Sequence, residues 1–331
     1  MSRHLNRNLQ LLTGTPINKP LDAYAYIKLK TPDAYRSMGH FEALHVAERD
    51  FFKKPTAYCN LDLVKTHLNV QTISRTKAEL HGYNLTPLFP DSEYDLAPEH
   101  QELYEKLVDE QLLLFSDGTV IDASSVQKLR HALQQIVVNF DHFSNDPTKK
   151  SAAYDLVDQT LEETECFKLG KSKLIIWVKY KLTSRSVLKY LKDSGIKAVG
   201  AYAEVDTEKG INAFMDDPTT RVLVANYQSA GAGLNPQYVC SEALFLELET
   251  VSMYIRQAVG RLDRTGQKTV PRMRFAVASN TVQVGLYESL LTNDDLVQYI
   301  EPSKTGIREM LLGRTTRSGK ILSLSKPAAV L

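Results

Sequence analysis

The sequence predicts an α/β protein in which a parallel sheet is covered by helices on both faces. Short apolar runs that favour strands alternate with segments that favour helices from residue 174 to residue 278. Such alternation is typical of strands joined by helical crossovers. Sheets of this kind place their ligand-binding loops at the carboxyl ends of their strands.

Five strands and three intervening helices are predicted in this half of the chain. The strands are expected at residues 174–178, 196–203, 221–227, 242–248 and 272–278. The first helix is expected to be capped by Thr183 or Ser184 and to stop at Gly195. A polar helix is expected to end near Phe214, and another helix is expected to begin at about residue 252.

The first half of the chain predicts a different organisation. Residues 20–100 have weak helical patterns and several prolines. The remaining elements are a strand with a turn at 10–18, a helix over 98–115, a hairpin at 114–122 around Asp117-Gly118, a second helix over 125–140, and a linker at 145–151.

Composition sets limits on function. The chain has 331 residues, enough for two domains, with 43% hydrophobic and 24% charged residues. No apolar run is long enough for a membrane helix, and the first residues do not resemble a signal peptide. The three widely spaced cysteines (Cys59, Cys166 and Cys240) indicate a reducing compartment. A net charge of +1 means that any nucleic-acid binding must come from local groups.

The segment QAVGRLDRTGQ, residues 257–267, is the first candidate for chemistry. Arg261 and Arg264 are three residues apart and share a helix face, and Gly260 leaves room for a close approach. Fixed guanidinium groups suit the charge that develops in phosphoryl transfer. The alternative is a solvated helix end in which one arginine pairs with Asp263.

Two more loops carry small and hydroxyl residues. One of these loops is VANYQSAGAGLNPQ, residues 224–237, and it contains Ser229, Gly231, Gly233 and Asn235. Because these residues are small and follow an apolar strand, the loop could expose backbone N–H groups to phosphate oxygens. LLTGTPIN, residues 11–18, contains Thr13, Gly14 and Thr15. Taken singly, the two loops could equally be a tight turn and an ordinary strand exit.

In this order, the three segments resemble motifs III, V and VI of the Swi/Snf-type branch of helicase superfamily two. Further likenesses are KLIIWVKY (173–180), ISRTKAEL (73–80) and KLRHALQQI (128–136). The resemblance covers about residues 5–295. It implies two RecA-like lobes that bind ATP with Mg²⁺ in the cleft between them, and hydrolysis that steps the protein along duplex DNA.

The resemblance also implies roles for individual residues. Arg261 and Arg264 would be catalytic arginine fingers that face the ATP phosphates. Gln257, also assigned to the catalytic group, would help couple nucleotide to DNA. A second group would couple nucleotide to DNA: Thr13, Gly14, Thr15, Ser229, Gly231, Gly233, Asn235 and Gly260. No metal ligand is expected in this chain.

The P-loop and the acidic DExH box of the family are missing from the sequence. The nearest P-loop-like stretch, ECFKLGKS at 165–172, has Glu165 at the first glycine position and precedes a strand, so it is not expected to bind phosphate. The sequence therefore predicts the C-terminal portion of a longer motor, as a product of a split gene, a truncated frame or a partial record. In the first case, a separate polypeptide would carry the P-loop and the DExH box. The expected divisions are a lobe-one remnant (1–90), a helical and hairpin insertion (91–150), RecA-like lobe two (151–300) and a mobile basic tail (301–331).

Two alternatives remain open: a non-catalytic DNA-binding or interaction module, and an inactive fragment. Bound DNA is expected to be duplex and recognised without sequence preference. The compact insertion favours a bacterial or phage member and hence the cytoplasm, or the nucleus for a eukaryotic one. The sequence does not distinguish strand separation from translocation or remodelling.

Overall fold

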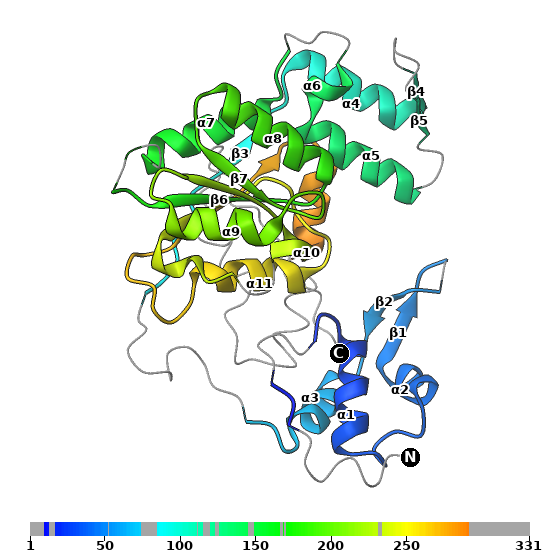
Figure 1. The fold of residues 1–331 in the computed structure, drawn as a ribbon. Helices are drawn as coiled ribbons and strands as arrows, with labels where there is room; N and C mark the ends of the chain where they lie inside the picture. The colour runs from blue at the N-terminus through cyan, green and yellow to red at the C-terminus, as the bar shows by residue number, and fades with distance from the viewer. Residues whose placement is uncertain are drawn as a thin grey trace.

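A computed structural model describes two parts of the chain, a small N-terminal unit (residues 17–73) and a larger α/β unit (residues 85–290) (Figure 1). Within 10–290 the described residues are 10–12, 17–51, 53–73, 85–110, 112–114, 120–122, 126–144, 149–165, 168, 170–230 and 234–290. Side chains are described for all of these except 112–114, 120–122, 126 and 127. Within these ranges, none of the helices has the length and apolar character needed to cross a membrane.

The α/β unit contains a five-stranded parallel sheet in the order β10-β9-β6-β8-β7. Its strands are β6 (Lys173–Val178), β7 (Ala198–Ala201), β8 (Val222–Asn226), β9 (Cys240–Phe245) and β10 (Arg272–Phe275). Every residue of β6 and β9 is buried, because helices cover both faces of these central strands. The structure confirms the predicted α/β class and agrees with the RecA-like lobe that the resemblance implies.

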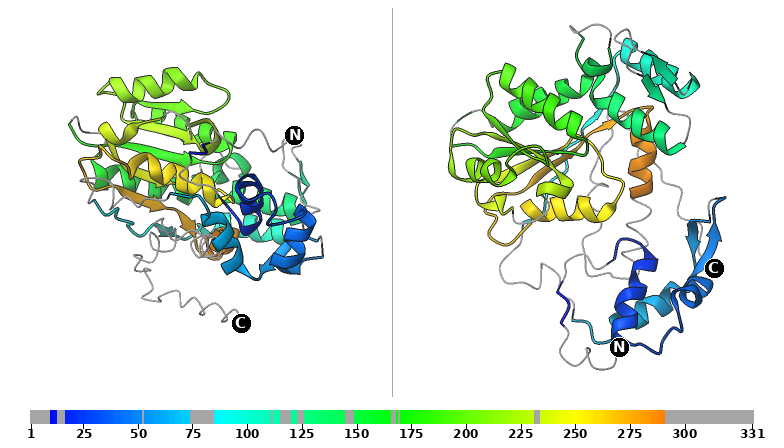
Figure 2. Two further views of the ribbon diagram at one scale, coloured as in Figure 1. Left: turned by 90° about the horizontal axis from the view of Figure 1, so that it is seen from below. Right: turned by 45° about the vertical axis from the view of Figure 1, so that its right-hand side comes forward.

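Alternate residues of each strand pack into two separate cores, one on each face of the sheet. On one face, Ile176 and Val224 pack with α7 (Ala152–Thr164) and α8 (Lys181–Asp193). On the other face, the partners are α9 (Thr207–Asp216), α10 (Tyr227–Ala230) and α11 (Ser252–Leu262). The two views of Figure 2 show these helical layers on opposite sides of the strands. A further helix covers residues 282–290.

Aromatic rings fill the second core. Trp177 stacks on Tyr227 with ring centroids 5.5 Å apart, and Phe245 stacks on Phe275 at 4.3 Å. Trp177 and Phe245 are completely buried. These rings lie directly beneath α10 and α11, so they support the segments that carry the candidate site.

The region before the sheet forms α4 (Pro98–Glu110), a hairpin of β4 (Leu112–Leu114) with β5 (Val120–Asp122), α5 (Val126–Val138) and α6 (Phe140–Phe143). The antiparallel pairing of β4 with β5 confirms the predicted hairpin, whose turn lies outside the described residues. Ile136 and Val137 of α5 are fully buried in the same core as α7 and α8. Helix α5 is therefore packed into the α/β unit.

Two short parallel contacts lie along the β10 side of the sheet. The predicted strand 272–278 is divided at Ala276, because β11 (Val277–Ala278) leaves the main sheet and pairs with β3 (Glu93–Tyr94). Leu88 bridges Arg272 in the same direction. Residues 88–94 therefore run beside β10 and β11, the last strands that the structure describes.

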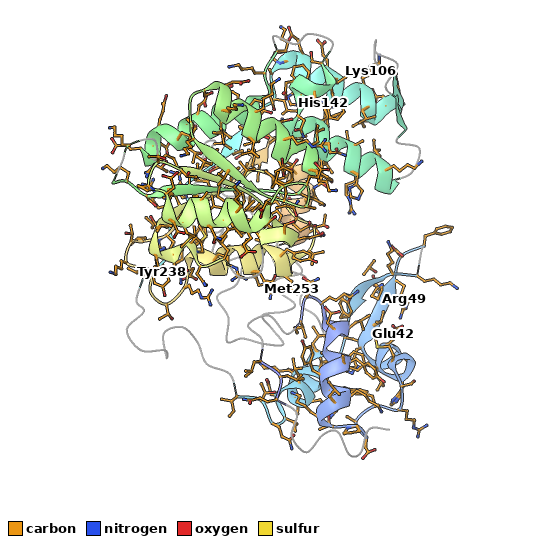
Figure 3. The ribbon with its side chains drawn as sticks, in the orientation of Figure 1. Glu42, Arg49, Lys106, His142, Tyr238 and Met253 are labelled. Carbon is orange, nitrogen blue, oxygen red and sulfur yellow. The ribbon has the colours of Figure 1, made fainter. Side chains whose placement is uncertain are left out.

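The N-terminal unit has its own core of eight buried residues. Its elements are α1 (Ala23–Lys30), α2 (Met38–His45), the antiparallel pair β1 (Val46–Arg49) and β2 (Pro55–Tyr58), and α3 (Leu61–Asn69), with the 3-10 helix η2 at Pro20–Asp22. The core consists of Ile17, Leu21, Ala23, Ile27, Tyr35, Phe41, Val64 and Leu68. Figure 3 shows side chains filling this unit and the α/β unit separately.

Tyr35 bridges two histidines inside this unit. Its hydroxyl lies 2.9 Å from His45 Nε2 and 3.0 Å from His67 Nδ1. His45 Nδ1 lies 3.3 Å from the Cys59 carbonyl oxygen, so Nδ1 must be the donor there. Tyr35 therefore donates to His45 and accepts from His67. Burial lowers the pKa of His45, which keeps the imidazole neutral in this arrangement.

Several sequence expectations need correction. The helix expected over 98–115 ends at Glu110, residues 112–114 form β4, and the strand expected at 196–203 is limited to β7. Helix α8 begins at Lys181, and Thr183 and Ser184 are buried within its first turn rather than capping it. Strand β9 ends at Phe245 rather than at residue 248. Residues 10–12, 17 and 18 form no strand.

Candidate functional site

Helix α11 carries the first part of the QAVGRLDRTGQ segment on the sheet's second face and ends at Leu262. Arg264 lies beyond the end of the helix, so the expectation that it shares a helix face with Arg261 is wrong. Ile255, Ala258, Val259 and Leu262 are buried against the aromatic core. This apolar stripe leaves Gln257, Gly260 and Arg261 half-exposed along the rest of the helix. None of the described atoms lies within 4 Å of where a Cβ on Gly260 would be, so this position is open.

The two arginines are held by the segment that follows α10. Arg261 Nη1 donates to the Leu234 carbonyl oxygen at 3.2 Å, and Arg264 Nη1 donates to Asn235 Oδ1 at 2.7 Å. Adjacent residues of the 234–235 segment therefore contact Arg261 in α11 and Arg264 just beyond it. The roles expected for Asn235, Arg261 and Arg264 remain predictions.

The positive charges of Arg261 and Arg264 favour the binding of an anion. Burial, and then the positive charge of Arg264, lower the pKa of Arg261. Arginine nevertheless stays charged at any ordinary pH, so two cations remain close together. Asp263 is buried rather than solvated, and the alternative in which Arg261 or Arg264 pairs with it stays open.

Strand β8 leads into the segment predicted to lie between nucleotide and DNA. Ser229 is half-exposed on α10, which packs beside α11. Tyr227 Oη donates to the Glu247 carbonyl oxygen at 2.7 Å, which fixes the start of α10 to the end of β9. Gly231 and Gly233 lie outside the described residues, so their roles remain predictions.

The first loop is described only in part. Thr13, Gly14 and Thr15 lie outside the described residues, and their roles also remain predictions. Asn18, at the end of the same segment, contacts the first turn of α11: its Oδ1 accepts hydrogen bonds from Ser252 Oγ at 2.6 Å and from the Met253 N–H at 3.0 Å. Sequence reasoning did not single out Asn18.

A buried carboxylate at the carboxyl edge of the sheet was also missed. Glu247 is 2% exposed, and it accepts hydrogen bonds from the N–H groups of Lys179 (2.7 Å) and Tyr180 (2.9 Å) and from Thr183 Oγ1 (2.5 Å). Burial raises its pKa to about 7, against the effect of these donors. These contacts draw the chain out of the sheet after Phe245, which explains the early end of β9.

In the P-loop-like stretch, the described side chains of Lys171 and Ser172 have partners within the protein. Lys171 Nζ forms a salt bridge with Glu165 Oε2 at 2.9 Å. Ser172 Oγ accepts a hydrogen bond from the Ser241 N–H at 2.7 Å. Both residues precede β6, at the edge opposite to the one where ligand loops of a parallel sheet lie. The expectation that residues 165–172 do not bind phosphate remains a prediction.

No protein-family model matches the sequence, and no curated protein sequence matches it. Several solved structures are similar in fold. The C-terminal part of the Fun30 ATPase domain aligns with a TM-score of 0.49 and 13% identity, over 67% of this chain and all of that chain.

Two structures from Sulfolobus solfataricus are also similar. The SWI2/SNF2 ATPase core domain aligns with a TM-score of 0.49 and 18% identity, over 87% of this chain and 60% of that chain. The SWI2/SNF2 ATPase C-terminal domain aligns with a TM-score of 0.44 and 14% identity, over 71% and 96%.

Proposed function

We propose that this chain provides the arginine-bearing lobe of a Swi/Snf-type, DNA-dependent ATPase. The observation that carries the proposal is the joint hydrogen bonding of Arg261 and Arg264 by Leu234 and Asn235. This hydrogen bonding brings together segments 224–237 and 257–267, two of the three that resemble Swi/Snf motifs, on the second face of the sheet. In this role the two guanidinium groups bind the phosphates of a nucleotide and stabilise charge in phosphoryl transfer.

The described residues fit the phosphates of ATP better than its metal ion. Arg261 and Arg264 supply fixed positive charge, and the open position at Gly260 allows a close approach. The described part of the chain has no group of three or more His, Cys, Asp or Glu side chains that could hold a metal ion. Mg²⁺ would therefore be held by the lobe with the P-loop and the acidic box, neither of which this sequence contains.

The test is phosphate binding by the 331-residue chain, measured by calorimetric titration with inorganic tripolyphosphate. Arg261→Ala and Arg264→Ala should each weaken binding on the order of tenfold, because each removes a charge-assisted contact. Arg36→Ala is the matched control, since it removes an equal charge from an exposed site on the N-terminal unit. Equal affinities for all four proteins would refute the assigned role.

The second part of the proposal is a DNA-binding surface that reads no sequence. Affinity for a duplex should fall steeply with salt and should be the same for unrelated sequences, because the contacts would be to the backbone. A preference for one duplex over another would contradict it. DNA binding without any tripolyphosphate binding would instead favour the non-catalytic module.

A further inference from the structure

Helix α11 takes its N-terminal cap from a distant part of the chain. The residue at its own N-cap position, Val251, has an extended backbone and no side chain that could accept a hydrogen bond. The oxygen that does so belongs to Asn18, 235 residues away from Met253, whose N–H it accepts. A first-turn N–H group normally finds such a partner in the residue next to the helix.

Both sides of this contact are held in place. The Asn18 N–H donates to Asp22 Oδ2 at 3.0 Å, and the adjacent Ile17 is buried in the core of the N-terminal unit. On the other side, Ser252 is 2% exposed and its Oγ accepts from Arg256 Nη2 at 3.1 Å. Figure 3 labels Met253 at the end of α11 that lies nearest the N-terminal unit. The hydrogen bonds therefore join two ordered parts of the chain.

We propose that Asn18 is a positioning residue that fastens the N-terminal unit to the helix that carries Arg261. An α-helix is stiff over the eight residues from Met253 to Arg261, about 12 Å at 1.5 Å per residue. A displacement of the N-terminal unit is therefore transmitted along α11 to the arginines. The consequence for catalysis rests on the proposed function, whereas the fastening itself does not.

Hydrogen exchange of the full-length chain tests the contact directly. Asn18→Ala should speed exchange of the amides in residues 252–256 about fivefold, which corresponds to the loss of about 1 kcal/mol from an N-cap. Asn18→Asp keeps an acceptor oxygen and should exchange at nearly the parent rate. Lys19→Ala is the control, because the Lys19 side chain is exposed and next to the contact.

A distance measurement distinguishes fastening from a purely local cap. Spin labels at Glu48→Cys and Lys189→Cys, two exposed positions in the two units, report their separation in a chain whose native cysteines are replaced. The parent and Asn18→Asp should give one narrow distance distribution, and Asn18→Ala should broaden or shift it.

The proposal would be overturned if amides 252–256 exchanged at the parent rate in Asn18→Ala. It would also be overturned if these amides exchanged as fast in Asn18→Asp as in Asn18→Ala. An unaltered distance distribution in Asn18→Ala would also overturn it, because the cap would then not hold the units together. Neither readout uses a nucleotide. If the exchange and distance results are as expected but the parent and the Arg261→Ala and Arg264→Ala variants bind tripolyphosphate equally, the proposed function alone is rejected.

Discussion

Glu247→Gln should remove a pH dependence from the stability of the α/β unit. The Glu247 carboxyl is buried, and its pKa is raised from 4.5 to about 7 in the folded protein. The folded state therefore holds a proton that the unfolded state has already lost between these pH values. Stability from this group is fully present below about pH 4.5 and is lost as the pH rises through about 7.

The size of the effect follows from the two pKa values. The interval from 4.5 to about 7 corresponds to a total loss of roughly 3 kcal/mol. Most of this loss, roughly 2–3 kcal/mol, falls between about pH 5 and about pH 8. Glutamine can keep the geometry, because its oxygen can accept from Lys179 and Tyr180 while its amide donates to Thr183.

Urea unfolding followed by tryptophan fluorescence is a suitable assay. Trp177 is the single tryptophan of the chain and is fully buried. Its carbonyl oxygen accepts from the Leu246 N–H, next to Glu247. The fluorescence therefore reports unfolding of the region that contains the carboxylate. The free energy of unfolding is measured at several pH values for the parent and for Glu247→Gln. The quantity compared between pH values is the parent-minus-variant difference in this free energy.

The comparison with Glu247→Gln is needed because a buried histidine titrates in the opposite sense. Burial lowers the pKa of His100 to about 4, so its contribution is present above pH 6.5 and lost as the pH falls. This contribution is common to both proteins and cancels in the difference. A parent-minus-variant difference that stays constant from pH 5 to pH 8 would show that Glu247 is ionised in the folded state, and the reasoning would be wrong.

Four further predictions concern stability. Phe245→Ala should cost about 3–5 kcal/mol in the same urea assay, because the ring is fully buried against Phe275, whereas Tyr238→Ala at an exposed ring should change little. Gly210→Ala should destabilise by about 1–3 kcal/mol, since its Cβ would lie 2.2 Å from the Gly200 carbonyl oxygen. Gly260→Ala, in an open helical position, should instead stabilise by up to about 1 kcal/mol while weakening tripolyphosphate binding. Tyr35→Phe should cost about 1–3 kcal/mol in the N-terminal unit, because it leaves His45 and His67 without their shared partner, and faster amide exchange in residues 35–67 would show it.

The sequence predicted the sheet better than the ends of its elements. Apolar runs such as LIIWV identify strands because both faces of a parallel sheet are buried. The ends depend on contacts between distant residues, which a local pattern does not contain. Thr183 suits a helix cap by type, but its hydroxyl instead donates to Glu247, 64 residues further along the chain.

The candidate site was predictable where a motif marked it. Arg261, Arg264 and Asn235 were chosen from their segments, and the structure brings them together. No sequence motif identified Asn18 or Glu247 as a candidate. An asparagine after an isoleucine, or a glutamate at a strand end, is ordinary in a sequence, and only the folded chain shows that these two side chains accept hydrogen bonds from distant parts of the protein.

The pairing of residues 88–94 beside β10 bears on how the protein can be dissected. A fragment that began at residue 151 would lack Leu88, whose N–H donates to the Pro271 carbonyl oxygen at 2.8 Å, and would also lack β3, the partner of β11. It would further lose the buried face of α5. A truncation intended to isolate the arginine-bearing lobe should therefore start near residue 85, ahead of the hairpin, so that the strand edge stays covered and the product resists aggregation.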